Sequence, residues 1–372
     1  DGEIISQSLN RVMQWGVGVP SGIDYAYHAV RMHLQTMFTE FEMRLAAGEE
    51  PDEDEIPAAL KADFKNGYNN TLRSKFIAQV QEKFPHTLRF VRSMYAKIAK
   101  VKYMHHGEVV HEVDSVRGSM QGDPMGSHLF ALSIYDFAAG LLRAVPTAMV
   151  TFIIDDLTIS DTQAGLVKAA DYISAHGPEY GLIKHPTKGS VYSPYSAIDA
   201  AWSPEDTLIC PVTGHGYRHD WEGFDKLLGA PMGEAHYEDN MCLERTEKAV
   251  KHIGKLARLQ DTQIEFMLLK YCYGTKITYL SRMVEPDTLE RSLHKFDSTL
   301  RKVLDRMVSN PRQSGSAVDD IRWKLAKLPI KNGGLGLQDI QMTAPAQHLA
   351  TLGQIYRMAK EQVEDGYDPA SK

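Results

Sequence analysis

The chain has 372 residues, of which 43% are hydrophobic and 24% are charged. This is the composition of a globular protein, and the length predicts two or three packed units. No apolar run reaches the ~18 residues that a membrane-spanning helix needs, so we expect no membrane segment. The cysteines are widely spaced, which provides no disulfide framework and favours a reducing compartment; they are Cys210, Cys242 and Cys272.

The net charge of −7 argues at first against a nucleic-acid partner, because polyanions attract basic proteins. The distribution of charged residues along the chain weakens this argument. Residues 245–331 carry 18 Lys or Arg and 10 Asp or Glu, whereas residues 1–244 carry 20 and 33. This asymmetry suggests that one part holds a polyanion and another part holds cations. Chance variation of surface charge is the alternative interpretation.

Apolar periodicity and turn residues predict mixed helices and strands in the first portion and long helices from Ala235 onward. The predicted elements of the first portion are helices at 23–45, 71–83 and 86–97, a β-hairpin at 101–116, a helix from Pro124, a β-hairpin around 155–156, a helix at 164–176 and a strand at 225–228. We interpret the acidic run at 49–55 as a solvated loop. The sequence therefore predicts an α+β portion followed by an all-helical portion.

Three carboxylates stand where the predicted elements could bring them together. Asp63 lies between a predicted strand and a helix, and Asp155 and Asp156 lie at the predicted tip of a hairpin. Hard cations such as Mg²⁺ prefer carboxylate oxygens, and two such ions can clamp an in-line displacement at phosphorus. An Asp pair is also common in ordinary turns, so these residues alone leave both interpretations open.

Residues 117–130 lie between these carboxylates and place glycines and a proline where a loop enters a helix. Glycine lets the backbone approach a ligand closely, and a helix N-terminus favours phosphate. An ordinary loop before a proline-initiated helix is the alternative.

The stretch 63–130 resembles the pattern of non-LTR retrotransposon reverse transcriptases. In that pattern D-F-K-N-A-F-N is followed by two helices and then by R-G-x-x-Q-G-D-P-x-G-x-x-L-F. The resemblance continues in order over more than 300 residues, through the segments 15–22, 181–188, 228–233 and 328–337. The segment 228–233 resembles the primer-grip turn of these enzymes. Departures from the pattern include Gly67 in place of Ala, Ile153-Ile154 before the Asp pair and His185 in place of Asn.

The resemblance implies a right-hand polymerase that copies RNA into DNA. The implied parts are partial fingers at 1–60, a palm at 61–234, a helical thumb at 235–309 and a C-terminal helical extension at 310–372. It also implies an RNA template, a DNA primer and dNTPs as partners, and two Mg²⁺ ions, or Mn²⁺, as cofactors. An intracellular location follows, in a nuclear or cytoplasmic ribonucleoprotein if the element is eukaryotic.

The same resemblance implies roles for individual residues. The catalytic metal ligands would be Asp63, Asp155 and Asp156. The residues that would bind the nucleotide are Phe64, Tyr68, Gln121, Gly122 and Lys188. Those that would contact template or primer are Arg117, Gly118, Gly229, Lys248, Lys251, Lys255 and Arg258. A ring at Tyr68 would clash with a ribose 2′-OH, which implies deoxynucleotide substrates.

The last four basic residues of that set also stand out by their spacing. Lys248, Lys251, Lys255 and Arg258 are three, four and three residues apart, which predicts one shared helix face. On a thumb helix this face would follow the phosphates of a duplex, whereas a solvated helix face is the alternative.

Two further expectations concern the protein as a whole. The basic fingers motif of the family would precede Asp1, so we expect other domains of the same polyprotein to be missing from this chain. The second hypothesis, from a different functional class, is a catalytically weak or decayed reverse transcriptase that acts as a nucleic-acid-binding scaffold.

Overall fold

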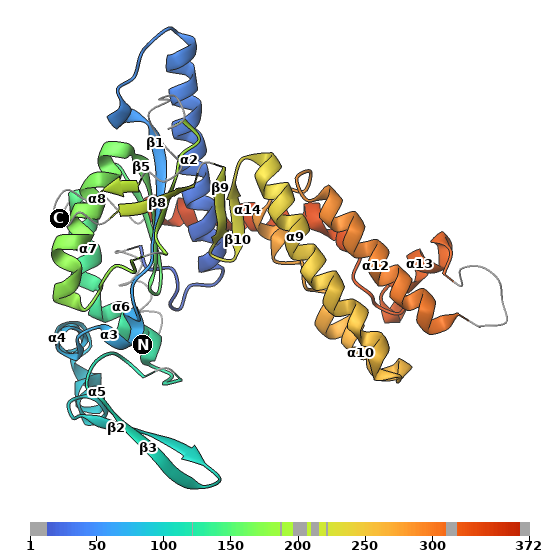
Figure 1. The fold of residues 1–372 in the computed structure, drawn as a ribbon, viewed down its shortest axis with the longest axis horizontal. Helices are drawn as coiled ribbons and strands as arrows, with labels where there is room; N and C mark the ends of the chain where they lie inside the picture. Colours follow the sequence, from blue (N-terminus) through green and yellow to red (C-terminus); the bar gives the residue numbers. More distant parts are fainter. Residues whose placement is uncertain are drawn as a thin grey trace. The chain divides into compact units, whose positions relative to one another are not determined.

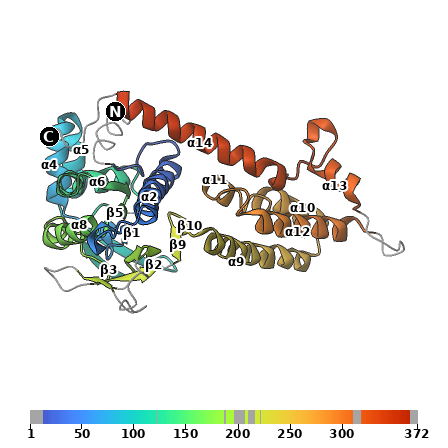
Figure 2. The same ribbon diagram turned by 90° about the horizontal axis from the view of Figure 1, so that it is seen from above.

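The structure, a computed structural model, describes residues 13–120, 122–186, 188–195, 207–209, 216–220, 222–309 and 318–364. It mixes helices and sheets, as the sequence predicts (Figures 1 and 2). The chain divides into two compact units: Asp1–Trp221 with Lys360–Lys372, and Glu222–Ala359. Among the described residues, no helix is both long enough and apolar enough to cross a membrane.

The first unit contains a six-stranded sheet, a separate β-hairpin and seven α-helices among its described residues. The helices are α2 (Gly22–Ala46), α3 (Gly67–Asn70), α4 (Arg73–Lys83), α5 (Leu88–Tyr95), α6 (Gly126–Ser133), α7 (Tyr135–Ala144) and α8 (Gln163–His176). The strands are β1 (Pro57–Ala62), β2 (Ala99–His105), β3 (Glu108–Ser115), β4 (Met149–Ile153), β5 (Asp156–Thr162), β6 (Ser190–Tyr192), β7 (Thr207–Ile209) and β8 (Gly216–Asp220).

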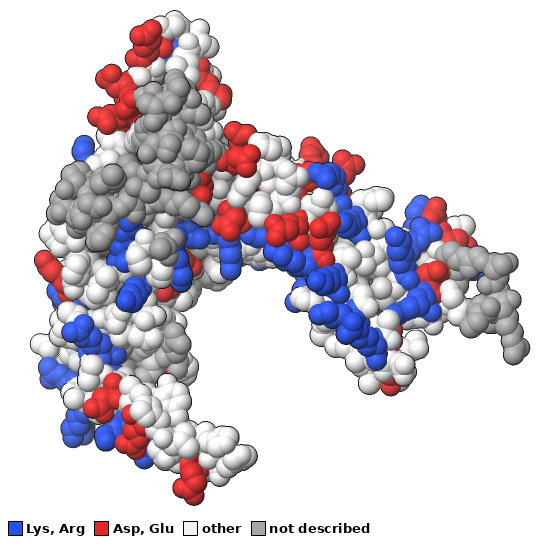
Figure 3. Space-filling view, viewed as in Figure 1, with Lys and Arg blue, Asp and Glu red and all other residues white. Residues whose placement is uncertain are grey.

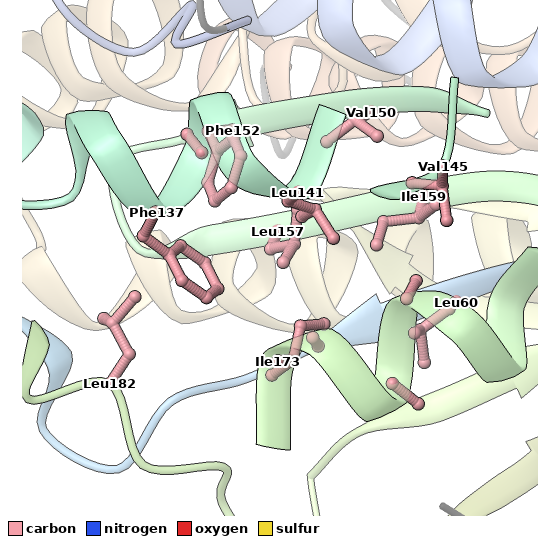
Figure 4. Close-up of a cluster of buried hydrophobic side chains, with 14 of the residues drawn as sticks. Leu60, Phe137, Leu141, Val145, Val150, Phe152, Leu157, Ile159, Ile173 and Leu182 are labelled. Carbon is pink, nitrogen blue, oxygen red and sulfur yellow. The ribbon is translucent and has the colours of Figure 1, made fainter. Parts of the chain in front are cut away.

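The sheet has the strand order β4-β5-β1-β6-β8-β7, so β1 lies in its interior. Because side chains alternate along a strand, Leu60 and Ile159 turn to one face, where they join a core with residues of α7 and α8 (Figure 4). On the other face lies α2, whose His33 hydrogen-bonds Ser160 of β5 at 2.9 Å. Helices therefore cover both faces of the sheet. The boundary predicted between the partial fingers (1–60) and the palm (61–234) falls within β1.

Most predicted elements of the first unit are confirmed, including the β2–β3 hairpin with its turn at His106 and Gly107. The helix predicted to begin at Pro124 begins instead at Gly126. The reason is a turn: the carboxylate of Asp123 accepts the Met125 N–H at 2.9 Å, and its carbonyl accepts the Gly126 N–H at 2.8 Å. The helical run is also interrupted at Ile134, which divides it into α6 and α7.

The second unit consists of a short hairpin and helices. Its elements are β9 (Gly223–Leu227), β10 (Ala230–Gly233), α9 (Ala235–Gly254), a 3₁₀ turn (Lys255–Leu259), α10 (Thr262–Leu268), a π turn (Leu269–Tyr273), α11 (Leu280–Met283), α12 (Glu290–Val308), α13 (Asp320–Lys327) and α14 (Ile340–Glu364), whose last residues count with the first unit. The predicted strand at 225–228 is confirmed as β9, and α9 packs along α12.

Candidate active site

The register of the sheet brings Asp63 to the tip of the β4–β5 hairpin. Strand β1 ends at Ala62, which pairs with Leu157 of β5, so Asp63 follows at the same end of the sheet. Pairing of Ile153 with Asp156 leaves Ile154 and Asp155 as a two-residue turn. Continued by one residue, the register would place Asp63 opposite Asp156. The predicted convergence of strand end and hairpin tip is therefore present in the backbone.

The carboxyl groups of Asp63 and Asp155 interact electrostatically. Burial raises the pKa of Asp155 above the ordinary value of an aspartate, a hydrogen bond from its own backbone N–H opposes this, and the charge of Asp63 raises the pKa further. A Cβ at Gly67 would lie 3.2 Å from the Asp155 Cβ and 3.5 Å from its Oδ2, so glycine leaves room for this carboxylate. Two repelling carboxylates with hard oxygen donors fit a divalent cation, which would relieve their repulsion.

Asp156 begins β5 and is exposed. Across the described part of the chain, no three His, Cys, Asp or Glu side chains gather closely enough to hold a metal ion. The predicted three-carboxylate site therefore stays a prediction, and the pair Asp63 and Asp155 supports it.

The ring of Tyr68 is fixed in place by two contacts. It stacks on Phe130, with ring centroids 5.1 Å apart and an interplanar angle of 7°, and its hydroxyl donates to Ser127 Oγ at 2.9 Å. By contrast, the side chain of Phe64 is only 5% exposed and packs edge-on against Phe137 in the core. Any nucleotide contact by Phe64 would therefore be made by its backbone.

The loop after β3 is held by Arg73, a residue that the sequence analysis missed. Arg73 is 8% exposed, and its guanidinium donates to the carbonyl oxygens of Gly118 at 3.1 Å and Lys97 at 3.2 Å, and to Ser115 Oγ at 2.9 Å. A Cβ at Gly118 would lie 2.4 Å from the Tyr68 carbonyl oxygen, so the loop touches the helix that carries the Tyr68 ring. The residues next to Arg73 in the sequence give no sign of this role, because its hydrogen-bond acceptors lie in distant segments.

Tyr95 fastens the next part of the same loop. Its hydroxyl accepts the Met120 N–H at 3.2 Å and donates to the carboxylate of Asp123, and burial is the largest of the effects that raise the pKa of Tyr95 to about 12. Gln121 lies outside the described residues. Its neighbour Gly122 is exposed and has a φ of 92°.

Two more of the residues predicted to contact nucleotide or template lie in the first unit. Arg117 and Lys188 are both exposed. The segment that leads to Lys188 pairs with the backbone around Asp63: His185 N–H donates to the Asp63 carbonyl at 2.8 Å, and Lys65 N–H donates to the Ile183 carbonyl at 2.8 Å.

In the second unit, the β9–β10 turn at Leu228 and Gly229 has positive φ at both residues, 48° and 93°. Two side chains fix it. Arg245 donates to the Gly229 carbonyl at 2.6 Å, and the Tyr279 hydroxyl donates to the Leu228 carbonyl at 2.5 Å. The predicted primer-grip turn is thus anchored to α9 and to the residue that precedes α11 in the same unit.

The four predicted phosphate-binding residues are all exposed; they are Lys248, Lys251, Lys255 and Arg258. Figure 3 shows Lys and Arg side chains gathered on this face of the second unit. The prediction that they share one α-helix is wrong. Helix α9 ends at Gly254, a weak helix former, and Lys255 and Arg258 lie on the following 3₁₀ turn.

A second set of basic residues, on α12, faces acidic partners within the same unit. Arg291 bonds Asp239 at 2.5 Å, and Lys295 and Arg306 pair with glutamates of α9 and α10. These charges are engaged within the second unit. In the α9 set, Lys248 pairs with Glu244 on the surface at 2.6 Å.

We expect Asp155→Asn to stabilise the metal-free protein at neutral pH. A carboxyl whose folded-state pKa is raised contributes stability that is present below its ordinary pKa and is lost as pH rises through the raised value. The neutral amide avoids this cost, so Tm at pH 7.5 should rise, and the difference should vanish near pH 3, where the carboxyl is protonated in both states. Thermal unfolding followed by circular dichroism measures this, with the exposed Asp156→Asn as control. A lower Tm for Asp155→Asn at pH 7.5 would mean that favourable partners hold the charged carboxylate.

No known protein-family profile matches the chain. Over 292 residues, or 77% of its length, it is 21% identical to the retrotransposable element SLACS 132 kDa protein of Trypanosoma brucei gambiense, of which it spans 23%. This relationship confirms the predicted resemblance: the chain is similar to a retrotransposon protein.

The solved structures that the chain resembles include two telomerases. One is telomerase from Candida albicans in complex with the TWJ fragment of telomeric RNA, at 13% identity and a TM-score of 0.40, with 95% of this chain and 53% of that chain covered. The other is apo telomerase from Candida tropicalis, at 12% identity and a TM-score of 0.39, with 82% and 54% covered. The chain thus spans about half the length of these telomerases and about a quarter of the SLACS protein.

Proposed function

We propose that the chain is the polymerase portion of a retrotransposon-type reverse transcriptase. The observation that carries this proposal is the approach of Asp63 to Asp155, two carboxylates far apart in the sequence, at one end of the interior strands. In the proposal, residues 61–234 act as the palm and 235–309 as the thumb. The partners are an RNA template, a DNA primer and dNTPs.

In this proposal Asp63 and Asp155 hold two Mg²⁺ ions, and Asp156 supports them electrostatically. When bound, such ions activate the attacking hydroxyl and stabilise the leaving group. Tyr68 excludes a ribose 2′-OH. The loop held by Arg73 positions nucleotide and template, and Lys188 approaches the triphosphate.

Primer extension on an RNA template tests the proposal. We expect Mg²⁺-dependent DNA synthesis from a DNA primer with dNTPs, by this chain or by a version extended upstream of Asp1. Synthesis only by the extended version would agree with the resemblance, which implies that upstream basic residues grip the triphosphate. If neither version made DNA under conditions where both bind the primer–template, the proposal would be wrong.

The Tyr68 ring should determine sugar choice. Because the ring is fixed by Phe130 and Ser127, Tyr68→Val should open space for a ribose and raise the ratio of rNTP to dNTP incorporation by roughly 10-fold or more. Single-nucleotide primer extension with each substrate measures the ratio. Tyr68→Phe is the matched control, since it keeps the ring and removes only the hydroxyl. Unchanged discrimination in Tyr68→Val would assign the gate to another residue.

A further inference from the structure

The turn that carries Asp155 has an unfavourable backbone conformation. Ile154, the first of its two residues, has a φ of 58°. In this region the Cβ of an L-residue crowds its own backbone, and for a β-branched side chain the conformation is rare. Two-residue hairpins normally place Asn, Asp or Gly at such a position. Contacts from elsewhere in the molecule must therefore hold Ile154 in place.

The side chain of Gln14 makes these contacts. Its Oε1 accepts the Ile154 N–H at 2.8 Å, and its Nε2 donates to the Ile154 carbonyl at 3.1 Å. One amide thus binds both backbone polar groups of the strained residue across 140 positions of sequence. Gln14 is only 1% exposed, so water does not compete for these bonds.

Neighbouring residues fix Gln14 itself. Met13 and Trp15 flank it and hydrogen-bond Phe152 of β4, at 2.9 and 2.8 Å, which aligns this segment along the edge of the sheet. The Gly16 N–H also donates to Gln14 Oε1 at 3.2 Å. A Cβ at Gly16 would lie 2.8 Å from the Ile154 nitrogen and 3.1 Å from Gln14 Oε1, so only glycine leaves the contact undisturbed.

We propose that Gln14 is a positioning residue that holds Ile154 in its left-handed conformation and thereby directs the Asp155 carboxylate toward Asp63. The inference rests on the proposed function, in which these two carboxylates bind the catalytic cations. Asp155 is the other residue of the same two-residue turn, so a change of backbone at Ile154 changes the direction of its side chain. Gln14 touches no reacting atom and acts through the turn.

The test compares Gln14→Met, which keeps the side-chain length and removes all three hydrogen bonds, with Gly16→Ala, which crowds the same contact. The matched control is Gln35→Met on the exposed surface of α2. Each variant is assayed for Mn²⁺ affinity by electron paramagnetic resonance, for kcat in primer extension and for primer–template Kd. We expect both variants to lose about 10–100-fold in Mn²⁺ affinity and kcat, as for residues that orient metal ligands, with Kd unchanged.

A second substitution separates positioning from a general structural role. Asn tolerates the left-handed region, so Ile154→Asn supplies locally the conformation that Gln14 imposes. In the Ile154→Asn background, Gln14→Met should cost several-fold less in Mn²⁺ affinity than it does alone. Equal costs in both backgrounds would overturn the inference.

Two further outcomes distinguish the inference from the proposed function. If Gln14→Met keeps full Mn²⁺ affinity and kcat while Asp155→Asn is inactive, the function stands and the positioning role is wrong. If Asp155→Asn synthesises DNA normally, the proposed function fails, whereas a loss of Mn²⁺ binding in Gln14→Met would still support the role of Gln14 in the turn.

Discussion

Replacing Asp155 by Asn should reduce template-directed synthesis by at least about 100-fold, and Asp63→Asn should do the same. Changing a residue that merely orients a metal ligand lowers metal affinity or activity by about 10–100-fold. Loss of a ligand itself should therefore lower the rate by at least about 100-fold. Asn keeps the shape of the side chain but gives up one anionic oxygen. Primer-extension rates at saturating dNTP, measured over a range of Mg²⁺ concentrations, give the loss and show whether more Mg²⁺ recovers it.

The matched control for these variants is Asp54→Asn, an exposed change in the acidic run that follows α2. It removes the same charge from the same unit and should leave the rate unchanged. Asp156→Asn should cost less than Asp155→Asn, because Asp156 is exposed and is proposed to act mainly through its charge. More than a tenth of the wild-type rate in Asp155→Asn would exclude this carboxylate as a metal ligand.

Removing the four basic residues of α9 and its 3₁₀ turn should strongly weaken duplex binding; the variant changes Lys248, Lys251, Lys255 and Arg258 to Ala. Each phosphate contact releases counterions, so the slope of log affinity against log salt should become shallower by roughly three to four units. Fluorescence anisotropy with a labelled RNA–DNA duplex from 50 to 300 mM salt measures this slope.

The control for the basic patch changes the engaged cations of α12, Arg291, Lys295 and Arg306, to Ala. Their charges are already paired within the second unit, so the salt slope should change by less than about one unit in total. An unchanged slope in the α9 variant would mean that this face is merely solvated.

The same binding assay bears on the scaffold hypothesis. That hypothesis would be favoured if the chain, also in a version extended upstream, bound the duplex but made no DNA.

The sequence predicts the parts of this site that depend on local patterns. The two short apolar runs on either side of Asp155 and Asp156 locate a hairpin tip, and the predicted strand before Asp63 locates a strand end. These meet in the sheet. Turn residues likewise locate the hairpin at His106 and Gly107. Such signals lie within a few neighbouring residues, so no long-range contact is needed to recognise them.

What the sequence could not predict depends on contacts between distant segments. The conformation of Ile154 contradicts its local preference and is imposed by Gln14, which gives no sign of this role among its neighbours. The role of Arg73 in holding the loop at Gly118 depends on carbonyl oxygens from separate segments. The end of α9 at Gly254 was missed because regular spacing of basic residues continues beyond the point where the helix tightens.

In the proposed function, Asp63 and Asp155 bind two divalent cations for nucleotidyl transfer. The most direct measurement is X-ray diffraction at the manganese edge from crystals of the chain grown with Mn²⁺, primer–template and a non-hydrolysable dNTP analogue. We expect two anomalous peaks about 3.5–4 Å apart, both in contact with these carboxylates, and their loss in Asp155→Asn crystals. Manganese bound only elsewhere, or two peaks that persist in the Asp155→Asn crystals, would contradict this proposal.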